Sequence, residues 1–107
     1  MHREIEDIFG RKVRFTDERK KHLEEDHPEM KDSEDLIINT LQEPEEVKFS
    51  RSDKTVELFY KFFQTSIVGA KYLCVAVKNL ITDYFIITAY YTDKKKKGDS
   101  KWIKVEK

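Results

Sequence analysis

Tyr72-Leu73-Cys74-Val75-Ala76-Val77 decides the fold, because this stretch is apolar on both of its faces. Side chains alternate across a strand, so a strand of this kind lies in the middle of a sheet. A second apolar stretch runs from Tyr84 to Thr92, after a polar turn over residues 79 to 83. The pattern therefore predicts two adjacent central strands in an antiparallel hairpin.

Further strands flank this hairpin. Residues 56 to 63 alternate with a period of two, residues 47 to 49 do so more briefly, and residues 102 to 105 predict a short last strand. Near the N-terminus, Gly10 separates two short segments that contain apolar residues, which predicts another hairpin.

Two helices are expected before the main run of strands. Thr16 is a good N-cap for a helix from about Asp17 to Asp26, with acidic residues in the first turn. Pro28 disfavours helical geometry at the preceding residue and so ends this helix. Residue 32 or 33 caps a second, amphipathic helix that closes at Pro44. Helices followed by strands indicate the α+β class, here a single domain over residues 1–107 with an antiparallel sheet of four to five strands.

The composition limits the classes of function. Charged residues make up 39% of the chain, but 21 basic residues balance 21 acidic ones, so no overall field attracts nucleic acid. Any anion site must therefore come from local clustering. The single cysteine, Cys74, excludes an internal disulfide and indicates a reducing compartment. No signal peptide or membrane span is visible, so a cytoplasmic protein without a membrane partner is expected.

Two of the three histidines, His22 and His27, lie in one short polar stretch. On a regular helix they would lie about 140° apart, which is not the geometry of a helical zinc pair, so no metal or other cofactor is expected. An imidazole suits general acid–base chemistry at neutral pH. Arg19 shares a helix face with His22. The structural alternatives are a helix-end role for His27 and an ion pair for Arg19.

The last long strand carries hydroxyl groups. Strand alternation places Thr88, Tyr90 and Thr92 on one face, together with Ile86. Threonine and tyrosine are also good strand formers, so an exposed sheet face is the structural alternative. The opposite face is expected to pack on the helices through Phe85, Ile87, Ala89 and Tyr91.

Basic residues bracket the strands. Four lysines at residues 94–97 precede Gly98, Lys78 ends the first central strand, and Arg51 lies in a polar turn. Aromatic and basic residues interleaved on a sheet are typical of surfaces that stack bases and hold phosphates. A run of charges is also the usual composition of a solvated turn.

Several of these stretches together resemble the phage-associated branch of the barnase–EndoU–colicin–RelE nuclease superfamily. The resemblance rests on residues 9–19, on the His-Leu-Glu-Glu-Asp-His-Pro-Glu-Met run that starts at His22, and on residues 72–78 and 85–98. It covers roughly Gly10 to Trp102. It implies N-terminal helices packed on a twisted four-stranded antiparallel sheet, and metal-independent RNA cleavage by a toxin or effector.

The resemblance also implies roles for single residues. His22 and His27 match its helix histidines and Thr88 and Tyr90 its strand hydroxyls, so these four are the candidate catalytic residues. Of the two histidines, His22 is preferred because Arg19 accompanies it. The candidate substrate-binding residues are Arg19, Lys78, Thr92, Lys97 and Arg51, the last from the charge pattern alone.

These features lead to the hypothesis of a metal-independent endoribonuclease that acts by 2′-hydroxyl transesterification. RNA is then the substrate, and a toxin of this kind would have a cognate antitoxin or immunity protein. The chemistry requires an imidazole within about 8 Å of Thr88 and Tyr90. The alternative is a module that binds RNA or protein without cutting, which the neutral net charge and the acidic residues 24–26 favour.

Overall fold

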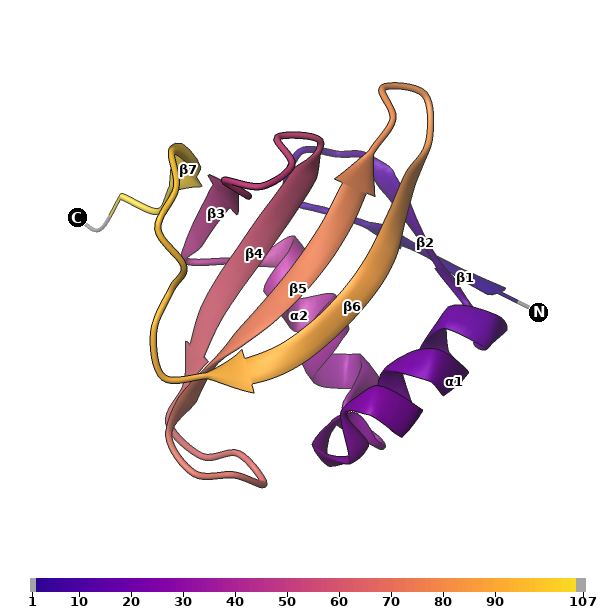
Figure 1. Cartoon of the computed structure of the whole chain (residues 1–107), viewed down its shortest axis with the longest axis vertical. Coiled ribbons are helices and arrows are strands. Elements are labelled where there is room, and N and C mark those ends of the chain that lie inside the picture. Colours follow the sequence, from indigo (N-terminus) through magenta and orange to yellow (C-terminus); the bar gives the residue numbers. More distant parts are fainter. Residues whose placement is uncertain (1, 106–107) are drawn as a thin grey trace.

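Residues 2–105, which the computed structural model describes, form one seven-stranded sheet with two α-helices (Figure 1). The helices are α1 (Asp17–Asp26) and α2 (Glu34–Gln42), and a 3-10 turn, η1 (Pro28–Met30), lies between them. The strands are β1 (His2–Glu6), β2 (Lys12–Thr16), β3 (Glu46–Phe49), β4 (Val56–Phe63), β5 (Lys71–Asn79), β6 (Tyr84–Thr92) and β7 (Ser100–Ile103).

The sheet is larger than predicted, and it is mixed. Its strand order is β1-β2-β6-β5-β4-β3-β7, in which β2 pairs parallel to β6 and the other pairs are antiparallel. The expectation of N-terminal helices on an antiparallel sheet of four to five strands is therefore wrong. The N-terminal hairpin β1–β2 joins the sheet because Val13 and Phe15 are apolar residues that β6 and the helices bury.

Helix α1 forms as its sequence predicts. The Oγ1 atom of Thr16 accepts a hydrogen bond from the backbone N–H of Arg19 at 3.1 Å, which satisfies one free donor of the first turn. The helix ends before His27, because Pro28 follows. Leu23 is the only α1 residue that is buried, so the helix is held beside β6 by a narrow contact. No helix in residues 2–105 is long and apolar enough to cross a membrane.

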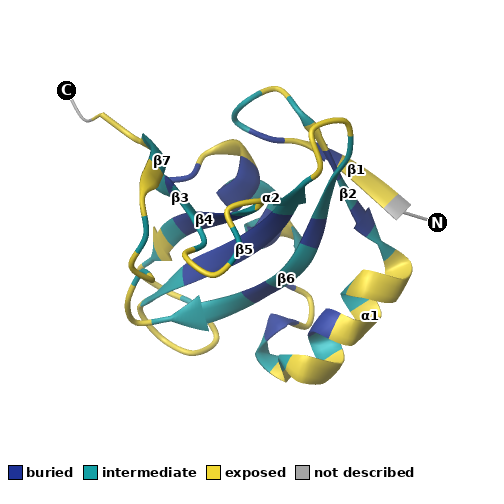
Figure 2. Cartoon of the chain, turned by 45° about the horizontal axis from the view of Figure 1, so that its top comes forward, coloured by how far each residue is buried: buried dark blue, intermediate teal, exposed yellow. Residues whose placement is uncertain are grey.

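Helix α2 covers one face of the sheet and closes the main core (Figures 1 and 2). Ile37 and Leu41 of α2 are fully buried against alternate residues of the central strands. The strand residues that share this core are Ile5, Val13, Phe15, Val47, Phe59, Leu73, Val75, Val77, Ile86 and Ala89.

The face of β4–β6 turned away from α2, which we call the open face, carries a second and smaller apolar cluster. Its buried members are Leu58, Tyr60, Cys74 and Ala76. The partly buried side chains around them are Val56, Tyr72, Ile87 and Tyr90. None of the helices within residues 2–105 covers this cluster, so the open face is where a ligand can meet the sheet.

A β-bulge in β6 changes which residues face the core. Ala76 pairs with Thr88, but Val77 pairs with Ile86, so Ile87 is the extra residue. Ile86 consequently joins the main core and Ile87 the open face, which reverses the predicted assignment of both. Beyond the bulge the predicted alternation holds, and Tyr90 lies on the open face.

The hairpin tip between β5 and β6 contains a strained residue. Ile81 has φ +73°, although its side chain is β-branched, and it is 83% exposed. A left-handed conformation costs an L-residue about 1–2 kcal/mol, and asparagine tolerates it better. We expect Ile81→Asn to raise the free energy of unfolding by about 1 kcal/mol, measured by urea denaturation.

Ile67→Asn is the matched control for this prediction. Ile67 is also exposed, at 78%, but it has no positive φ. The control should change the free energy of unfolding by less than about 0.5 kcal/mol. Equal effects of the two substitutions would show that backbone strain at Ile81 is not the cause.

Candidate functional site

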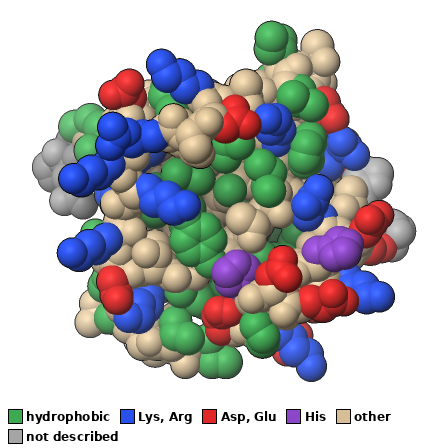
Figure 3. All heavy atoms as spheres, in the orientation of Figure 1, with side chains coloured by type: hydrophobic (Ala, Val, Ile, Leu, Met, Phe, Trp, Pro, Cys, Tyr) green, Lys and Arg blue, Asp and Glu red, His purple; other side chains and the backbone are tan. Residues whose placement is uncertain are grey.

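The open face has an apolar floor and a cationic rim. Figure 3 shows hydrophobic side chains in the middle of this face, with lysines and arginines around its left and upper sides. Acidic side chains gather with the histidines at the lower right, where α1 lies. The segment that joins β6 to β7, residues 93–99, runs along the opposite border, and we call it the strap.

His27 is the histidine that reaches the sheet. Its ring stacks on the ring of Tyr90, with centroids 5.9 Å apart and an angle of 29° between the planes. The two ring centres are therefore closer than the limit of about 8 Å that we set for Tyr90. The chain turns at His27, between α1 and η1, and this turn brings the imidazole back over β6. Glu29 lies 3.8 Å from its Nδ1 atom.

The hydroxyl of Tyr90 points into the protein. Its oxygen is buried and has no hydrogen bond of good geometry among residues 2–105, although it lies beside the thiol of Cys74 and the hydroxyl of Tyr60. Burial, reinforced by these two neighbours, raises the pKa of Tyr90. The phenol therefore stays protonated, and Tyr90 contributes its ring rather than a base.

The strap places lysines over this aromatic floor. The Nζ atom of Lys96 lies 5.6 Å from the centre of the Tyr90 ring, and the backbone N–H of Lys96 donates to the Tyr60 hydroxyl at 3.0 Å. The Nζ atom of Lys95 lies 5.3 Å from the centre of the Tyr72 ring. Lys96 has no acidic partner within 4.0 Å among residues 2–105, so its charge is available to an anion beside His27 and Tyr90.

The hydroxyl groups of the two threonines of β6, Thr88 and Thr92, have different surroundings. Thr88 lies two residues before Tyr90 on the open face, opposite Ala76, so its hydroxyl belongs to the same surface. The Oγ1 atom of Thr92 accepts from the backbone N–H of Lys94 at 3.3 Å and donates to its carbonyl at 2.9 Å. Thr92 therefore fixes the start of the strap.

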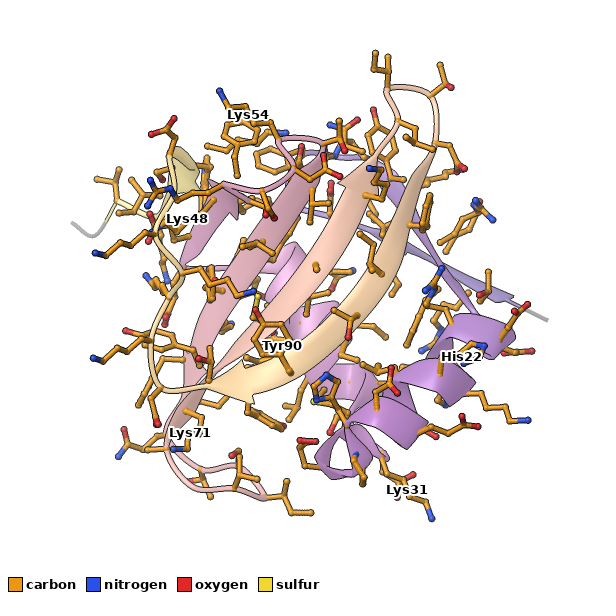
Figure 4. The ribbon with its side chains drawn as sticks, viewed as in Figure 1. His22, Lys31, Lys48, Lys54, Lys71 and Tyr90 are labelled. Carbon is orange, nitrogen blue, oxygen red and sulfur yellow. The ribbon has the colours of Figure 1, made fainter. Side chains whose placement is uncertain are left out.

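His22 is not brought to the sheet hydroxyls. Its side chain is 59% exposed, and Figure 4 shows it on α1, well away from Tyr90. Its Nε2 atom lies 3.8 Å from Glu18. The preference for His22 over His27 is therefore wrong, because a regular helix turns His22 towards solvent whereas the chain reversal at Pro28 returns His27 to β6.

The predicted cations are spread over three places. Arg19 is exposed beside a shallow cavity of about 190 Å³ that Arg14 and Phe85 also line. Lys97 is exposed on the strap. Arg51 lies in a separate cavity, described below.

Lys78 is already paired. Its Nζ atom lies 2.9 Å from Asp53 and donates to the Thr55 hydroxyl at 2.6 Å. Hydrogen bonds from Lys78 and Thr55 hold the pKa of Asp53 at about 2, so the pair stays ionised at neutral pH. Lys78 therefore fixes the turn between β3 and β4, and its charge is not free for a substrate.

No protein-family model, curated protein or solved structure matches this chain. Within residues 2–105, no three His, Cys, Asp or Glu side chains form a group that could hold a metal ion.

Sequence reasoning missed a buried ion cluster at the upper end of the sheet, which we call the Glu57 cluster. Glu57 is 1% exposed. Its carboxylate accepts hydrogen bonds from Arg11 at 2.6 Å, from Lys101 at 2.8 Å and from Asn79 at 2.8 Å. The backbone N–H and the Nε atom of Arg11 donate to the buried Asp7, both at 2.9 Å. The cluster ties the N-terminal hairpin, β4, β5 and β7 together.

The signal for this cluster was present in the sequence. Alternation along residues 56–63 placed Glu57 on the same face as the core residue Phe59, and a carboxylate in that position needs cationic partners. The partners Arg11 and Lys101 lie 46 and 44 residues away in the chain, so local patterns could not identify them.

Gly98 holds the strap against β3. A Cβ atom on Gly98 would collide with the backbone oxygen of Phe49, and its φ is +157°. We expect Gly98→Ala to lower the free energy of unfolding by about 1–3 kcal/mol more than Gly69→Ala does, measured by urea denaturation. Gly69 is a matched control because it also has a positive φ, +91°, but nothing within 4 Å of its Cβ position. Equal losses would mean that the close approach to Phe49 is unimportant.

Proposed function

We propose that this chain binds single-stranded RNA across the open face and cleaves it without a metal, with His27 as the group that moves the proton. The observation that carries the proposal is the stacking of His27 on Tyr90 beside Lys96, which has no acidic partner within 4.0 Å among residues 2–105. An imidazole, an aromatic platform and a free ammonium thus gather on one face. The resemblance of residues 9–19, 22–30, 72–78 and 85–98 to the phage-associated branch of the nuclease superfamily supports the same proposal.

The proposed reaction is a transesterification at one phosphodiester. His27 takes the proton of the ribose 2′-hydroxyl, and the 2′-oxygen attacks the phosphorus. The bond to the 5′-oxygen breaks, and a 2′,3′-cyclic phosphate remains on the other product. A water molecule protonates the leaving oxygen, and the hydroxide that forms takes the proton back from His27. Lys96 stabilises the charge that develops on the phosphate oxygens, and the Thr88 hydroxyl orients the phosphate.

The aromatic residues of the open face favour binding of single-stranded over double-stranded RNA. Bases that are free to unstack can lie on aromatic side chains, whereas a duplex hides them. Tyr72 lies under Lys95, and Phe85 lies under Arg14 with the guanidinium carbon 5.7 Å from the ring centre. Tyr72 thus extends the platform beside Tyr90, and Phe85 adds an aromatic ring near the start of β6.

A module that binds without cutting is the second candidate. Glu29 beside His27 and the acidic end of α1, residues 24–26, favour it, because they weaken the attraction of an RNA phosphate to this border. A module that binds RNA makes the same prediction for RNA binding as the nuclease and the opposite prediction for cleavage, whereas a module that binds protein predicts neither.

Incubation of the purified protein with single-stranded RNA tests the proposal. We expect cleavage that EDTA does not prevent, and 5′ fragments that end in a 2′,3′-cyclic phosphate. RNA that carries 2′-O-methyl groups should bind and stay intact. Binding without cleavage of either RNA would favour the second candidate, and the absence of both binding and cleavage would overturn the proposal.

A further inference from the structure

A cavity of about 460 Å³ lies between the strap and the turn that joins β3 to β4. Its lining residues are Phe49, Ser50, Arg51, Lys54, Gly98 and Asp99. The volume falls in the range of about 300–1,000 Å³ that small-molecule sites occupy. Figure 4 shows Lys54 at the upper end of the molecule, away from Tyr90, so this cavity is distinct from the site proposed for cleavage.

The cavity has a surplus of positive charge. Arg51 and Lys54 line it, and neither has an acidic partner within 4.0 Å among residues 2–105. The neighbouring carboxylate that could neutralise them, Asp53, is held by Lys78 and Thr55 instead. Asp99 is the one acidic residue in the described lining, so two cations oppose one carboxylate.

The walls of the cavity are fixed by backbone contacts. The N–H of Phe49 donates to the carbonyl of Asp99 at 2.8 Å, next to the close approach of Gly98. On the other wall, the N–H of Ser50 donates to the carbonyl of Val56 at 2.9 Å. An anion that enters therefore meets a backbone that is already in place, and little backbone ordering opposes binding.

We propose that this cavity binds a phosphorylated nucleotide, either free or as the 5′-phosphorylated end of an RNA. The guanidinium of Arg51 has the fork geometry that matches two phosphate oxygens, and Lys54 supplies a second positive charge. The hydroxyl of Ser50, which shares a hydrogen bond with Ser52 at 3.1 Å, can turn to a third oxygen. Phe49 supplies apolar surface for the rest of the nucleotide. This inference does not depend on cleavage.

The test is a titration by isothermal calorimetry and by backbone amide NMR. The probes are adenosine monophosphate and two 2′-O-methyl tetranucleotides that differ only in a 5′-phosphate or a 5′-hydroxyl. Their 2′-O-methyl groups prevent attack by the 2′-oxygen, so the result is separate from nuclease activity. We expect phosphorylated probes to bind and to shift the amide signals of Ser50, Arg51 and Gly98.

Single substitutions locate the site. Arg51→Ala should weaken binding by roughly tenfold or more, and Arg51→Lys should weaken it less, because the charge stays while the fork is lost. Lys31→Ala is the matched control: Lys31 is also exposed, and Figure 4 shows it at the end of the molecule opposite Lys54. This control should keep the affinity within about twofold.

The probes also identify the source of the phosphate. Binding of the monophosphate alone would assign a free nucleotide, and tighter binding of the 5′-phosphorylated tetranucleotide would assign an RNA end. Equal affinity for the 5′-hydroxyl and 5′-phosphate tetranucleotides, together with no binding of adenosine monophosphate, would overturn the proposal. An equal loss of affinity in Lys31→Ala and Arg51→Ala would also overturn it, because the attraction would then be a property of the whole surface.

Discussion

Glu57→Ala should lower the free energy of unfolding by about 3–5 kcal/mol, the largest loss that we expect from one substitution in this chain. The carboxylate is fully buried and receives hydrogen bonds from Arg11, Lys101 and Asn79. Its removal leaves Lys101 without its acidic partner and leaves the half-buried guanidinium of Arg11 with Asp7 alone. Urea denaturation followed by the fluorescence of Trp102 measures the loss.

Asp83→Ala is the matched control. Asp83 also receives two hydrogen bonds from an arginine of β2, Arg14, at 3.0 and 2.7 Å. Its side chain is 42% exposed, however, so solvent screens the pair and the expected loss is much smaller than that of Glu57→Ala. If both substitutions cost the same, burial of the Glu57 cluster is not what stabilises the fold.

The Glu57 cluster also makes stability depend on pH. Burial alone would raise the pKa of Glu57, but hydrogen bonds from Arg11, Lys101 and Asn79 outweigh it and lower the pKa below the ordinary value of 4.5. A carboxyl whose pKa is lower in the folded state stabilises the protein above the unfolded pKa, and this contribution is lost as the pH falls through the folded pKa.

We therefore expect the difference in unfolding free energy between the native protein and Glu57→Gln to be largest above pH 5 and to shrink steadily below about pH 4.5. The difference between the two proteins isolates this group from Asp53 and Asp83, whose pKa values are also lowered. Urea denaturation of both proteins from pH 7 to pH 3 provides the measurement. A difference that does not vary with pH would contradict the lowered pKa.

Local patterns predicted the elements of this fold better than their arrangement. The bounds of α1, β4 and β6 and the hairpin at Gly10 agree with the sequence, because a cap, a proline or a two-residue period marks each of them. The parallel pairing of Val13 with Tyr84 has no such mark. This pairing depends on which edge of the central hairpin is free to bury Val13. The strand at that edge, β6, begins about 70 residues later in the chain, so local patterns around Val13 do not indicate it. For the same reason the sheet was predicted to be too small.

For the candidate site, too, local patterns predicted some features and missed those that depend on the path of the chain. Alternation correctly placed Thr88 and Tyr90 on one face of β6. The choice between His22 and His27 depended on the path of the chain after α1, which a helical projection does not describe. The lysine that reaches Tyr90 is Lys96 rather than Lys97, because the path of the strap over Tyr60 decides which residue of the run faces inward.

His27→Ala should lower the rate constant for RNA cleavage by about 10²–10⁴-fold, the effect of losing one positioned proton-transfer group. The imidazole of His27 lies on the Tyr90 ring at the open face, where Lys96 is also found. No other imidazole in residues 3–105 replaces it, since His22 lies on α1 away from Tyr90. Single-turnover cleavage of a short RNA with one labelled end measures the rate constant.

His22→Ala is the matched control, because it removes the same group from an exposed position on the neighbouring helix. This substitution should change the rate constant by less than about twofold, because His22 lies too far from the proposed cleavage site to transfer a proton there. Both variants should keep the affinity for 2′-O-methyl RNA, because that binding depends on the aromatic floor and on Lys96. If His22→Ala reduces cleavage as much as His27→Ala, or if His27→Ala leaves the rate constant unchanged, His27 is not the group that moves the proton.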